Sequence, residues 1–515
     1  MPSLTVLACA AGSVLWLVYA ILDTLFLSPL AKVPGPKLFA LTKWRLALED
    51  WKGRRTQTIH DLHLQYGPAV RVGPNEVSFN NQGALRTIYG PGSRYGRTDF
   101  YRMFDVYGRQ NLFTFHSSVE HGRRKKLLSF AYSKTNILND TVANMVEAKA
   151  DTFMKLIDSE PEHISDIFST LHYYSLDNIT SFLYGKYGST SAMEGTQAHR
   201  ALIGDILDPA RRTLSWFAIH QPSLTRWLYT RTDLAERLVR PVLPMQKPAT
   251  YTGIRAFALD AYNRFRSDME NGKFDGDESS ILARLWKYSQ DPKGEPMDHL
   301  DIASECADHF LAGIDTTSDT LMFLVWALSQ PGSMGYQEKL RQEVLGISDE
   351  LLDHNGIPRA AETDKCVYLQ AIIKETLRLY APLPSYEPRS LDVDSEIEGY
   401  PIPANTVVGM SPFSLHRNPE IFPNPLEFNP ERWMGPDTKE LNRWFWAFSS
   451  GGRMCIGMHL AMAEMITLTA TIYRKYQTVI APGFEGATPG ITARFELFYD
   501  PRFPKVMVRI LDLAP

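Results

Sequence analysis

The residue best placed to do chemistry in this sequence is Cys455, which lies in the run Phe-Ser-Ser-Gly-Gly-Arg-Met-Cys-Ile-Gly at positions 448–457. One thiolate cannot close a disulfide or a zinc site, but it is enough for a haem iron, which needs a single protein sulfur. A haem also needs backbone N–H groups near that sulfur, a cation for a propionate and room for its flat ring. Gly451 and Gly452 permit positive φ angles and a tight turn. The run therefore predicts a haem-thiolate centre with Cys455 as the axial ligand of the iron.

The neighbours of Cys455 suit this chemistry. Phe448 can shield the sulfur from water, and Arg453 carries a fixed positive charge two residues away. Gly457 lets the next backbone segment lie close to a flat ligand. From Met458 onward the pattern predicts a helix, whose first N–H groups and positive dipole end favour the thiolate. The alternative is a buried structural cysteine in a glycine-rich turn.

At every fixed position this run matches the Phe-x-x-Gly-x-Arg-x-Cys-x-Gly signature of the cytochrome P450 family, which the chain resembles. Three further family elements follow the family's order, namely Ala-Gly-Ile-Asp-Thr-Thr at 312–317, Glu-Thr-Leu-Arg at 375–378 and Pro-Glu-Arg-Trp at 430–433. The resemblance extends from Pro34 to the C-terminus. It implies the cytochrome P450 fold and a haem b cofactor, iron protoporphyrin IX.

The segment from Asp301 to Leu328 has the pattern of a helix but contains residues that disfavour a regular one. Gly313 costs about 1 kcal/mol against alanine in a helix interior, and a threonine hydroxyl can bond back to the carbonyl four residues earlier. By the resemblance, small residues here leave space for dioxygen, while Asp315 and Thr316 are the catalytic pair that relays protons to it. Taken alone, Asp315 and Thr316 could be a solvated polar face.

Glu375 and Arg378 lie one turn apart on a helix expected from about 368 to 380, so their charged groups can meet. On a surface such a pair contributes under about 1 kcal/mol. The resemblance instead implies a buried network that Arg432 joins. We expect these three residues to hold the haem-binding core together rather than to act in catalysis.

The resemblance also implies partners for the haem propionates. They are Arg453, Arg389 and a helix in which the family's aromatic-or-histidine, three residues, arginine pattern begins at His121 and ends at Lys125. Lysine is a departure, because it supplies a point charge without the planar fork of arginine. The contact could therefore pass to Arg124 or be weaker. The basic run could also be a solvated face that meets an acidic partner.

Composition limits the classes of protein that fit. Hydrophobic residues are 44% and charged residues 22% of 515, as in a globular enzyme with a large core. The net charge is −4 and no basic stripe occurs, so no nucleic acid is expected as a partner. Four cysteines are too few for a disulfide framework and suit a reducing compartment. No linker or repeat divides the chain, which indicates one large domain behind a short anchor.

From Pro2 to Leu22 no side chain is charged, and at about 1.5 Å per residue this stretch can cross about 30 Å of hydrocarbon. We expect residues 1–31 to be a transmembrane signal anchor and residues 32–515 to be the haem-thiolate monooxygenase domain. Basic residues follow the span and none precedes it, which places the domain in the cytosol as a single-pass protein of the endoplasmic reticulum membrane. A cleaved signal peptide is the alternative, although the basic n-region is missing.

The remaining pattern agrees with a mainly α protein with small β-sheets. Strand, turn and strand are expected at 69–79, helices from about 141 to 345, and strands again at 386–408 and 492–511. By resemblance, the substrate pocket is lined by aromatic and apolar segments that suit a lipophilic substrate. These are 101–116, 211–217, Phe310 with Ala312, 383–386 and 495–498.

These observations predict a membrane-anchored haem-thiolate monooxygenase that uses O2 to oxidise, and most simply to hydroxylate, a lipophilic small molecule. Nothing resembles a flavin or nicotinamide domain, so NADPH-cytochrome P450 reductase is the expected electron donor. The segments Leu-Tyr-Ala-Pro-Leu-Pro at 379–384 and His-Arg-Asn-Pro at 416–419 resemble filamentous-fungal members that act in secondary metabolite biosynthesis. Two alternatives stay open: a haem-thiolate isomerase or peroxygenase that needs no reductase, and a non-catalytic membrane-tethered haem protein.

Overall fold

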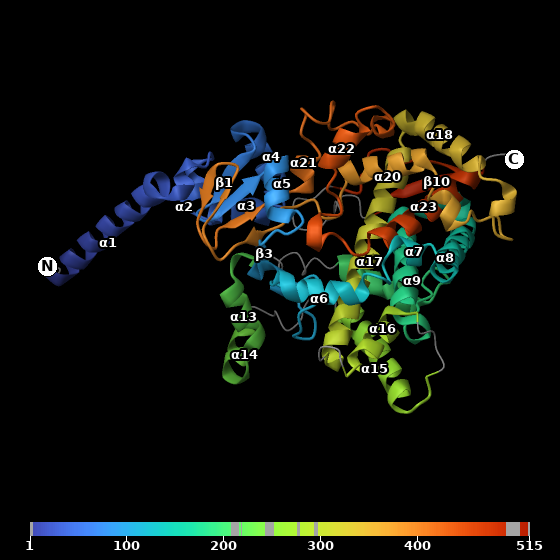
Figure 1. Cartoon of the computed structure of the whole chain (residues 1–515), viewed down its shortest axis with the longest axis horizontal. Helices are drawn as coiled ribbons and strands as arrows, with labels where there is room; N and C mark the ends of the chain where they lie inside the picture. The colour runs from blue at the N-terminus through green and yellow to red at the C-terminus, as the bar shows by residue number, and fades with distance from the viewer. Residues whose placement is uncertain are drawn as a thin grey trace.

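The chain folds into a large helical part and a smaller part rich in strands, and one N-terminal helix projects away from both (Figure 1). This computed structural model describes residues 4–207, 216–217, 219–242, 252–274, 279–292, 297–490 and 505–512. The predicted fold class, mainly α with small β-sheets, is confirmed.

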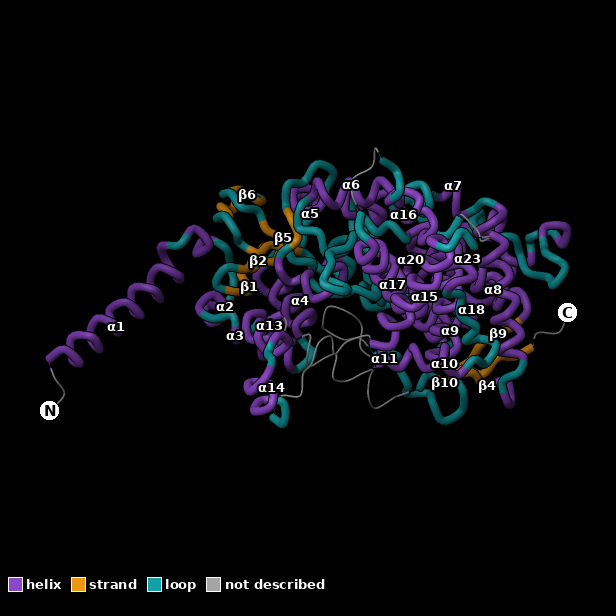
Figure 2. The backbone as a smooth tube through the Cα atoms, turned by 90° about the horizontal axis from the view of Figure 1, so that it is seen from below, coloured by secondary structure: helices purple, strands orange, loops and turns teal. Residues whose placement is uncertain are grey.

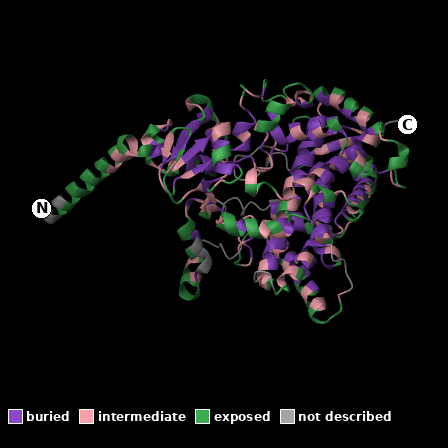
Figure 3. Ribbon diagram, viewed as in Figure 1, coloured by how far each residue is buried: buried purple, intermediate pink, exposed green. Residues whose placement is uncertain are grey.

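Helix α17 (His299–Leu328) is the central element of the helical part. Its N-terminus is fixed by a capping box, in which the Asp298 side chain accepts the N–H of Asp301 and the Asp301 side chain accepts the N–H of Asp298. Most of its side chains are buried, because other helices surround it (Figure 3). The helices that pack against it include α9 (Ile167–Tyr184), α15 (Thr252–Glu270), α16 (Ile281–Ser289), α20 (Val367–Leu379) and α23 (Met458–Lys475).

The other helices complete the two parts. In the helical part they are α6 (Ser118–Leu128), α7 (Lys134–Ile137), α8 (Asp140–Asp158), α10 (Gln197–Arg200), α11 (Gly204–Leu207), α18 (Met334–Leu345), α19 (Ala360–Thr363) and α22 (Thr438–Trp444). On the side of the strand-rich part lie α13 (Pro222–Thr230), α14 (Asp233–Val239) and α21 (Pro412–Leu415) (Figure 1). Near the strands they are α2 (Lys37–Leu41), α3 (Trp44–Trp51), α4 (Arg55–Tyr66) and α5 (Gln82–Tyr89).

Strands gather at two ends of the molecule (Figure 2). The five-stranded sheet has the order β1 (Ala69–Gly73), β2 (Glu76–Phe79), β8 (Val407–Gly409), β5 (Arg389–Ser390) and β3 (Gly96–Arg97). The other end carries β4 (Ile164–Asp166), β10 (Met507–Asp512) and β9 (Tyr476–Ile480). A hairpin of β6 (Ser395–Ile397) and β7 (Tyr400–Ile402) lies beside the five-stranded sheet. The strands predicted at 69–79 and 386–408 are therefore confirmed. Of the predicted C-terminal strand region, residues 492–504 lie outside the described residues.

Helix α1 (Leu4–Leu22) and the π-helical turn that follows it, Asp23–Leu27, make up the projecting N-terminal segment. Residues Cys9–Leu27 have a mean hydropathy of 1.8, and none of that window is buried against the rest of the chain. The Arg71 guanidinium donates to the carbonyl of Thr24 at 2.7 Å, and Leu30 is buried in the core around the sheet. The apolar helix is thus tied to the strand-rich part at its C-terminal end.

Candidate active site

The Cys455 loop lies between a 3-10 turn, η10 (Gly451–Arg453), and the first turn of α23. Gly451 has a φ of 62°, and a Cβ there would lie 2.3 Å from the carbonyl oxygen of Tyr89, so only glycine fits. Ser449, with a φ of 58°, is the other strained position, whereas Gly452 does not need a positive φ. The N–H of Cys455 donates to the carbonyl of Phe448 at 2.9 Å and closes the loop.

The Cys455 side chain is exposed although protein surrounds it, which means that it faces an internal space. Desolvation raises the pKa of the Cys455 thiol, while the N–H groups of Gly457 and Met458 and the Lys125 ammonium act in the opposite direction. The predicted helix N-terminus is therefore beside the sulfur, but it does not offset desolvation by itself. A metal cation at the sulfur would supply the remaining stabilisation of the thiolate.

The space beside the sulfur fits a flat cofactor. A Cβ built on Gly457 would meet only the sulfur of Cys455, at 4.0 Å, and one on Gly452 would meet nothing within 4 Å. The surrounding protein atoms do not require glycine at either position. An absent Cβ at Gly457 is what a planar ring lying against the Cys455 loop needs.

Basic side chains converge beside the Cys455 loop. A cavity of about 360 Å³ is lined by His121, Arg389 and Arg453, together with the backbone of Gly452, and its described lining includes no carboxylate. Desolvation and the nearby Arg453, Arg97, Lys125 and Arg389 lower the pKa of His121 to about 2. This region therefore holds more positive charge than its own residues compensate.

Arg97 belongs to this cluster and was missed by the sequence prediction. It lies opposite Arg389 in the antiparallel pairing of β3 with β5, and both side chains are buried. Its Nη1 donates to the carbonyls of Leu112 and Phe113, whereas its buried Nε has no hydrogen-bond partner. Desolvation, followed by the charge of Arg389, lowers the pKa of Arg97 to about 10. A buried donor without a partner among like charges is the environment that an anionic ligand would complete.

Arg389 and Arg453, both predicted propionate partners, have different surroundings. Arg389 donates to Tyr101 at 2.5 Å and to the Glu387 carboxylate at 3.1 Å, so its charge is partly compensated. Arg453 donates to the carbonyls of Phe115 and His116 at 2.9 and 2.7 Å and has no carboxylate partner in the described chain. Arg453 therefore keeps the larger uncompensated charge.

Lys125, where the family pattern has arginine, binds the Cys455 loop itself. Its Nζ donates to the carbonyls of Gly452 at 3.0 Å and Met454 at 2.7 Å. Arg124 instead forms an ion pair of 2.5 Å with Glu305, which is fully buried. Glu305 thus engages the Arg124 guanidinium in this structure, and the suggestion that Arg124 replaces Lys125 at a propionate stays a prediction.

Helix α17 brings Ala312 and Thr316 to one face. Ala312 is exposed although it lies in the middle of a buried helix, and the Thr316 hydroxyl donates to its carbonyl at 2.8 Å. Gly313 serves packing instead of open space, since a Cβ there would lie 2.4 Å from Cγ1 of Ile179 in α9. Ala312 is therefore the small residue that leaves room on the open face.

Asp315, the predicted partner of Thr316, lies near a buried histidine. Its Oδ1 is 3.9 Å from Nε2 of His172, and the ring's Nδ1 is 2.7 Å from the carbonyl of Phe168. Side-chain atoms of His172, Asp315 and Asp319 all lie within 4.8 Å of one another. The sequence did not indicate His172, because it comes from α9 and only helix packing brings it here.

The predicted substrate-pocket segments are only partly supported. Phe310 is fully buried against Tyr184 and Phe257, so its assignment to the pocket is wrong; it lies on the opposite side of α17 from Ala312. Tyr101 and Tyr386 are also buried, with hydroxyl groups bound to protein. Residues 211–215 and 495–498 lie outside the described residues.

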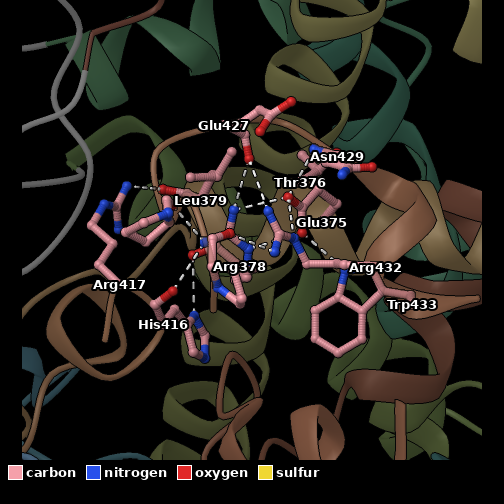
Figure 4. Close-up of polar contacts among 12 residues, drawn as sticks. Glu375, Thr376, Arg378, Leu379, His416, Arg417, Glu427, Asn429, Arg432 and Trp433 are labelled. Carbon is pink, nitrogen blue, oxygen red and sulfur yellow. Dashed lines mark hydrogen bonds and ion pairs between the residues drawn. The ribbon is translucent and has the colours of Figure 1, made fainter. Parts of the chain in front are cut away.

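The predicted buried network around Glu375 is present (Figure 4). Glu375 accepts two bonds of 2.8 Å from Arg378, one of 3.0 Å from Arg432 and one of 2.9 Å from the Trp433 indole. The N–H of Asn429 adds a bond of 2.9 Å. The remaining Arg378 donors bind the backbone carbonyls of His416, Pro425 and Glu427.

Comparison with known proteins agrees with this geometry. The sequence model of the family described as cytochrome P450 matches residues 34–489. The chain is 28% identical to cytochrome P450 monooxygenase tazI of Aspergillus terreus, over 90% of either chain. It is 29% identical to cytochrome P450 monooxygenase oblB of Cochliobolus heterostrophus, over 91% of this chain and 88% of that protein. It is 26% identical to cytochrome P450 monooxygenase FGM1 of Gibberella zeae, over 89% and 88%.

Proposed function

The chain belongs to the cytochrome P450 family and is a haem-thiolate monooxygenase, and from that premise we propose that it binds haem b and hydroxylates a lipophilic small molecule. The observation that carries the proposal is the excess positive charge beside the Cys455 loop. Two propionates would supply the matching negative charge, and the ring would lie against Gly457. When bound, the haem supplies the activation of O2, so that one oxygen atom enters the substrate and the other becomes water.

The chain's own residues hold the cofactor in this proposal. Cys455 supplies the thiolate, and the N–H groups of Gly457 and Met458 stabilise its charge. Phe448, which is partly buried against the helical core, shields the sulfur from water. Lys125 fixes the loop through its carbonyls rather than binding a propionate. These residues would therefore keep the sulfur charged and in place.

The propionates would be held by the basic cluster. Arg453, Arg97 and Arg389 donate from fixed planar guanidinium groups, which suit a carboxylate. His121 would gain a proton more easily once the propionates reduce the local positive potential. The cluster thus binds the cofactor by charge, while the Cys455 loop binds it by coordination.

Proton delivery falls to Thr316 and Asp315 in this proposal. The Thr316 hydroxyl now donates to the Ala312 carbonyl, and a rotation about its χ1 bond would turn the same proton toward the open face of α17. Asp315 would return a proton to Thr316, with His172 as the neighbour that holds the carboxylate in position. Ala312 leaves the space into which that proton moves.

We further propose that residues 1–31 anchor the protein in the endoplasmic reticulum membrane, with residues 32–515 in the cytosol. The exposed apolar stretch of α1 and the basic residues that follow it support this arrangement. NADPH-cytochrome P450 reductase in the same membrane would supply the electrons. Secondary metabolite biosynthesis is the proposed setting, in keeping with the fungal sources of the similar monooxygenases.

The test is a spectral screen on the purified, haem-loaded full chain. Lipophilic candidates that displace iron-bound water change the spin state, and each of these is then incubated with reductase, NADPH and O2. We expect an oxygenated product that requires all three. Product formed from peroxide alone would favour the peroxygenase alternative. A haem that accepts neither an added azole nor carbon monoxide would favour a non-catalytic haem protein.

A further inference from the structure

Asp308 is an acidic residue of α17 that the proposed chemistry does not use. It lies one turn before Ala312 and two turns before Thr316, at a spacing that puts all three on one face of the helix. The exposed or partly exposed positions Asp308, Leu311, Ala312, Asp315 and Thr316 follow the spacing i, i+3, i+4, i+7, i+8. Between residues 302 and 325 the other positions of the helix are buried apart from Gly313, so this stripe marks the side that faces open space.

Asp308 differs from the other acidic groups near it. On the same helix, Asp301 pairs with Arg109, Glu305 pairs with Arg124, and Asp315 lies beside His172. Within the described chain, no hydrogen bond or ion pair involves the Asp308 carboxylate. It is thus an unpaired carboxylate on the open stripe.

The surroundings of Asp308 make an unpaired carboxylate energetically unfavourable. Desolvation, with a smaller contribution from the Glu305 carboxylate, raises the pKa of Asp308 to about 7, while His309, Arg97 and Arg255 act in the opposite direction. Arg97 forms no hydrogen bond with it in the described chain, since the Arg97 donors that are bonded are directed to backbone carbonyls. A desolvated carboxylate without a partner loses the hydrogen bonds that water would give it. A ligand with a suitable donor would restore them.

We propose that Asp308 binds an N–H or O–H donor, a hydroxyl or an amine, on the substrate of this enzyme. The proposal rests on the proposed function, because it takes the open stripe of α17 as the substrate side of the haem. Asp308 and Thr316 are eight residues apart, or about 12 Å along the helix axis. The substrate is then a lipophilic molecule whose donor group lies at Asp308 and whose oxidised carbon lies toward Thr316.

The experiment uses imidazoles as probes on the haem-loaded full chain. Each probe carries an alkyl chain that ends in an amine, a hydroxyl, a methyl or a carboxylate group, in a series of chain lengths. The imidazole binds the haem iron, and titration of the Soret band gives the affinity. We expect one chain length at which the amine and hydroxyl probes bind about tenfold or more tightly than the methyl probe, as for hydrogen bonds to charged groups.

Three variants isolate the role of Asp308. Asp308→Asn should reduce the amine preference to about twofold or less and leave the methyl probe unchanged, because the amide keeps the size but loses the charge. Asp308→Glu should move the preferred probe to a chain about one carbon shorter, which a merely structural residue would not do. Asp260→Asn, on the exposed surface of α15, is the matched control and should change nothing.

The outcomes separate this proposal from the one on which it rests. Equal amine preference in the native protein and in Asp308→Asn would overturn the Asp308 proposal, as would equal loss of every probe. A shorter optimum in Asp308→Glu would support it. If no imidazole shifts the haem spectrum in any variant, the proposed haem site itself fails.

Discussion

Two regions of this molecule bury arginines, and they balance the charge differently. Around Glu375, the charged side chains are bound to groups of the protein: the carboxylate accepts from Arg378, Arg432 and Trp433, and backbone carbonyls accept from the other Arg378 donors and from Arg417 (Figure 4). Around His121, several cations face one another; in the described part of the chain Glu387 is the carboxylate bound to Arg389, and the buried Nε of Arg97 has no hydrogen-bond partner. The first region is complete within the protein and serves the fold. The second lacks negative charge and indicates an anionic ligand.

The same difference explains how each region keeps its basic side chains buried. A buried ion pair is held only when its geometry is good and its other donors are satisfied, and Arg378 meets both conditions. His121 stays neutral because desolvation, followed by the cations near it, lowers its pKa, which reduces the repulsion among these side chains. Removing a residue should therefore affect folding in the first region and cofactor retention in the second.

The largest expected effect is that of Glu375→Ala. This change leaves Arg378 and Arg432 buried without their carboxylate, at a cost of roughly 3–5 kcal/mol. We expect little folded protein and no retained haem, measured by soluble yield and haem absorbance. Glu440→Ala, in an exposed ion pair with Arg443, is the control and should fold normally. A well-folded, fully haem-loaded Glu375→Ala protein would contradict the structural role.

Arg453→Gln should weaken haem retention while the protein still folds. It removes a cation that has no carboxylate partner, so haem should dissociate roughly tenfold faster, since a charge-assisted hydrogen bond to a propionate is lost. The thermal stability of the haem-free protein should fall less than in Arg378→Gln. Haem transfer to an acceptor protein and thermal unfolding measure the two effects. If Arg453→Gln unfolds the protein as readily as Arg378→Gln, the two regions do not differ as stated.

Thr316→Ala should leave folding and haem content intact and alter the use of NADPH. Without the hydroxyl, the proton at Oγ1 is lost from the open face of α17, so consumed NADPH should yield hydrogen peroxide in place of product. Asp315→Asn should instead slow O2 consumption, because it removes the group that returns the proton. Product, peroxide and NADPH are measured together. An unchanged ratio of product to NADPH in Thr316→Ala would mean that the hydroxyl only serves its bond to Ala312.

The smallest expected effect is a pH dependence of the free energy of unfolding that comes from the region around Glu375. Desolvation, with Arg378 and Arg417, lowers the pKa of His416 to about 3, and its Nε2 accepts the N–H of Trp446 at 2.8 Å. The unfolded chain takes up a proton near pH 6.5 and the folded chain does not. His416 therefore contributes stability above pH 6.5 that is lost as the pH falls toward 3.

Between pH 7 and pH 6 this loss amounts to about 0.7 kcal/mol for one group. Denaturant unfolding at both pH values measures it, and His416→Gln should reduce the difference by that amount. No reduction would mean that His416 already carries a proton in the folded protein.

Sequence could predict those parts of the site that depend on spacing within one element. Cys455, Gly457 and the start of α23 are neighbours in the chain, and Glu375 meets Arg378 through one helical turn. Arg97 could not be found in this way, because it reaches Arg389 only through the pairing of β3 with β5. A strand of two residues has no periodic signal of its own.

A second limit was that the sequence could not predict which side of a helix is buried. Phe310 and Ala312 are two residues apart, so they point to nearly opposite sides of α17, and only the packing of α9 and α15 decides which side is buried. Gly313 illustrates the same limit, since its missing Cβ accommodates Ile179 of α9. The fold class needed no such contacts, because helical and strand periods are local.

The most direct test of the account is the ferrous carbonyl spectrum of the native protein and of Cys455→Ser. The account predicts a thiolate-type spectrum for the native protein and its loss in Cys455→Ser, together with loss of oxygenation, because an alcohol is a far weaker electron donor than a thiolate. A control variant, Cys366→Ser, removes a buried cysteine elsewhere and should keep the native spectrum. A carbonyl spectrum that is the same in Cys455→Ser and in the native protein would contradict the haem-thiolate assignment.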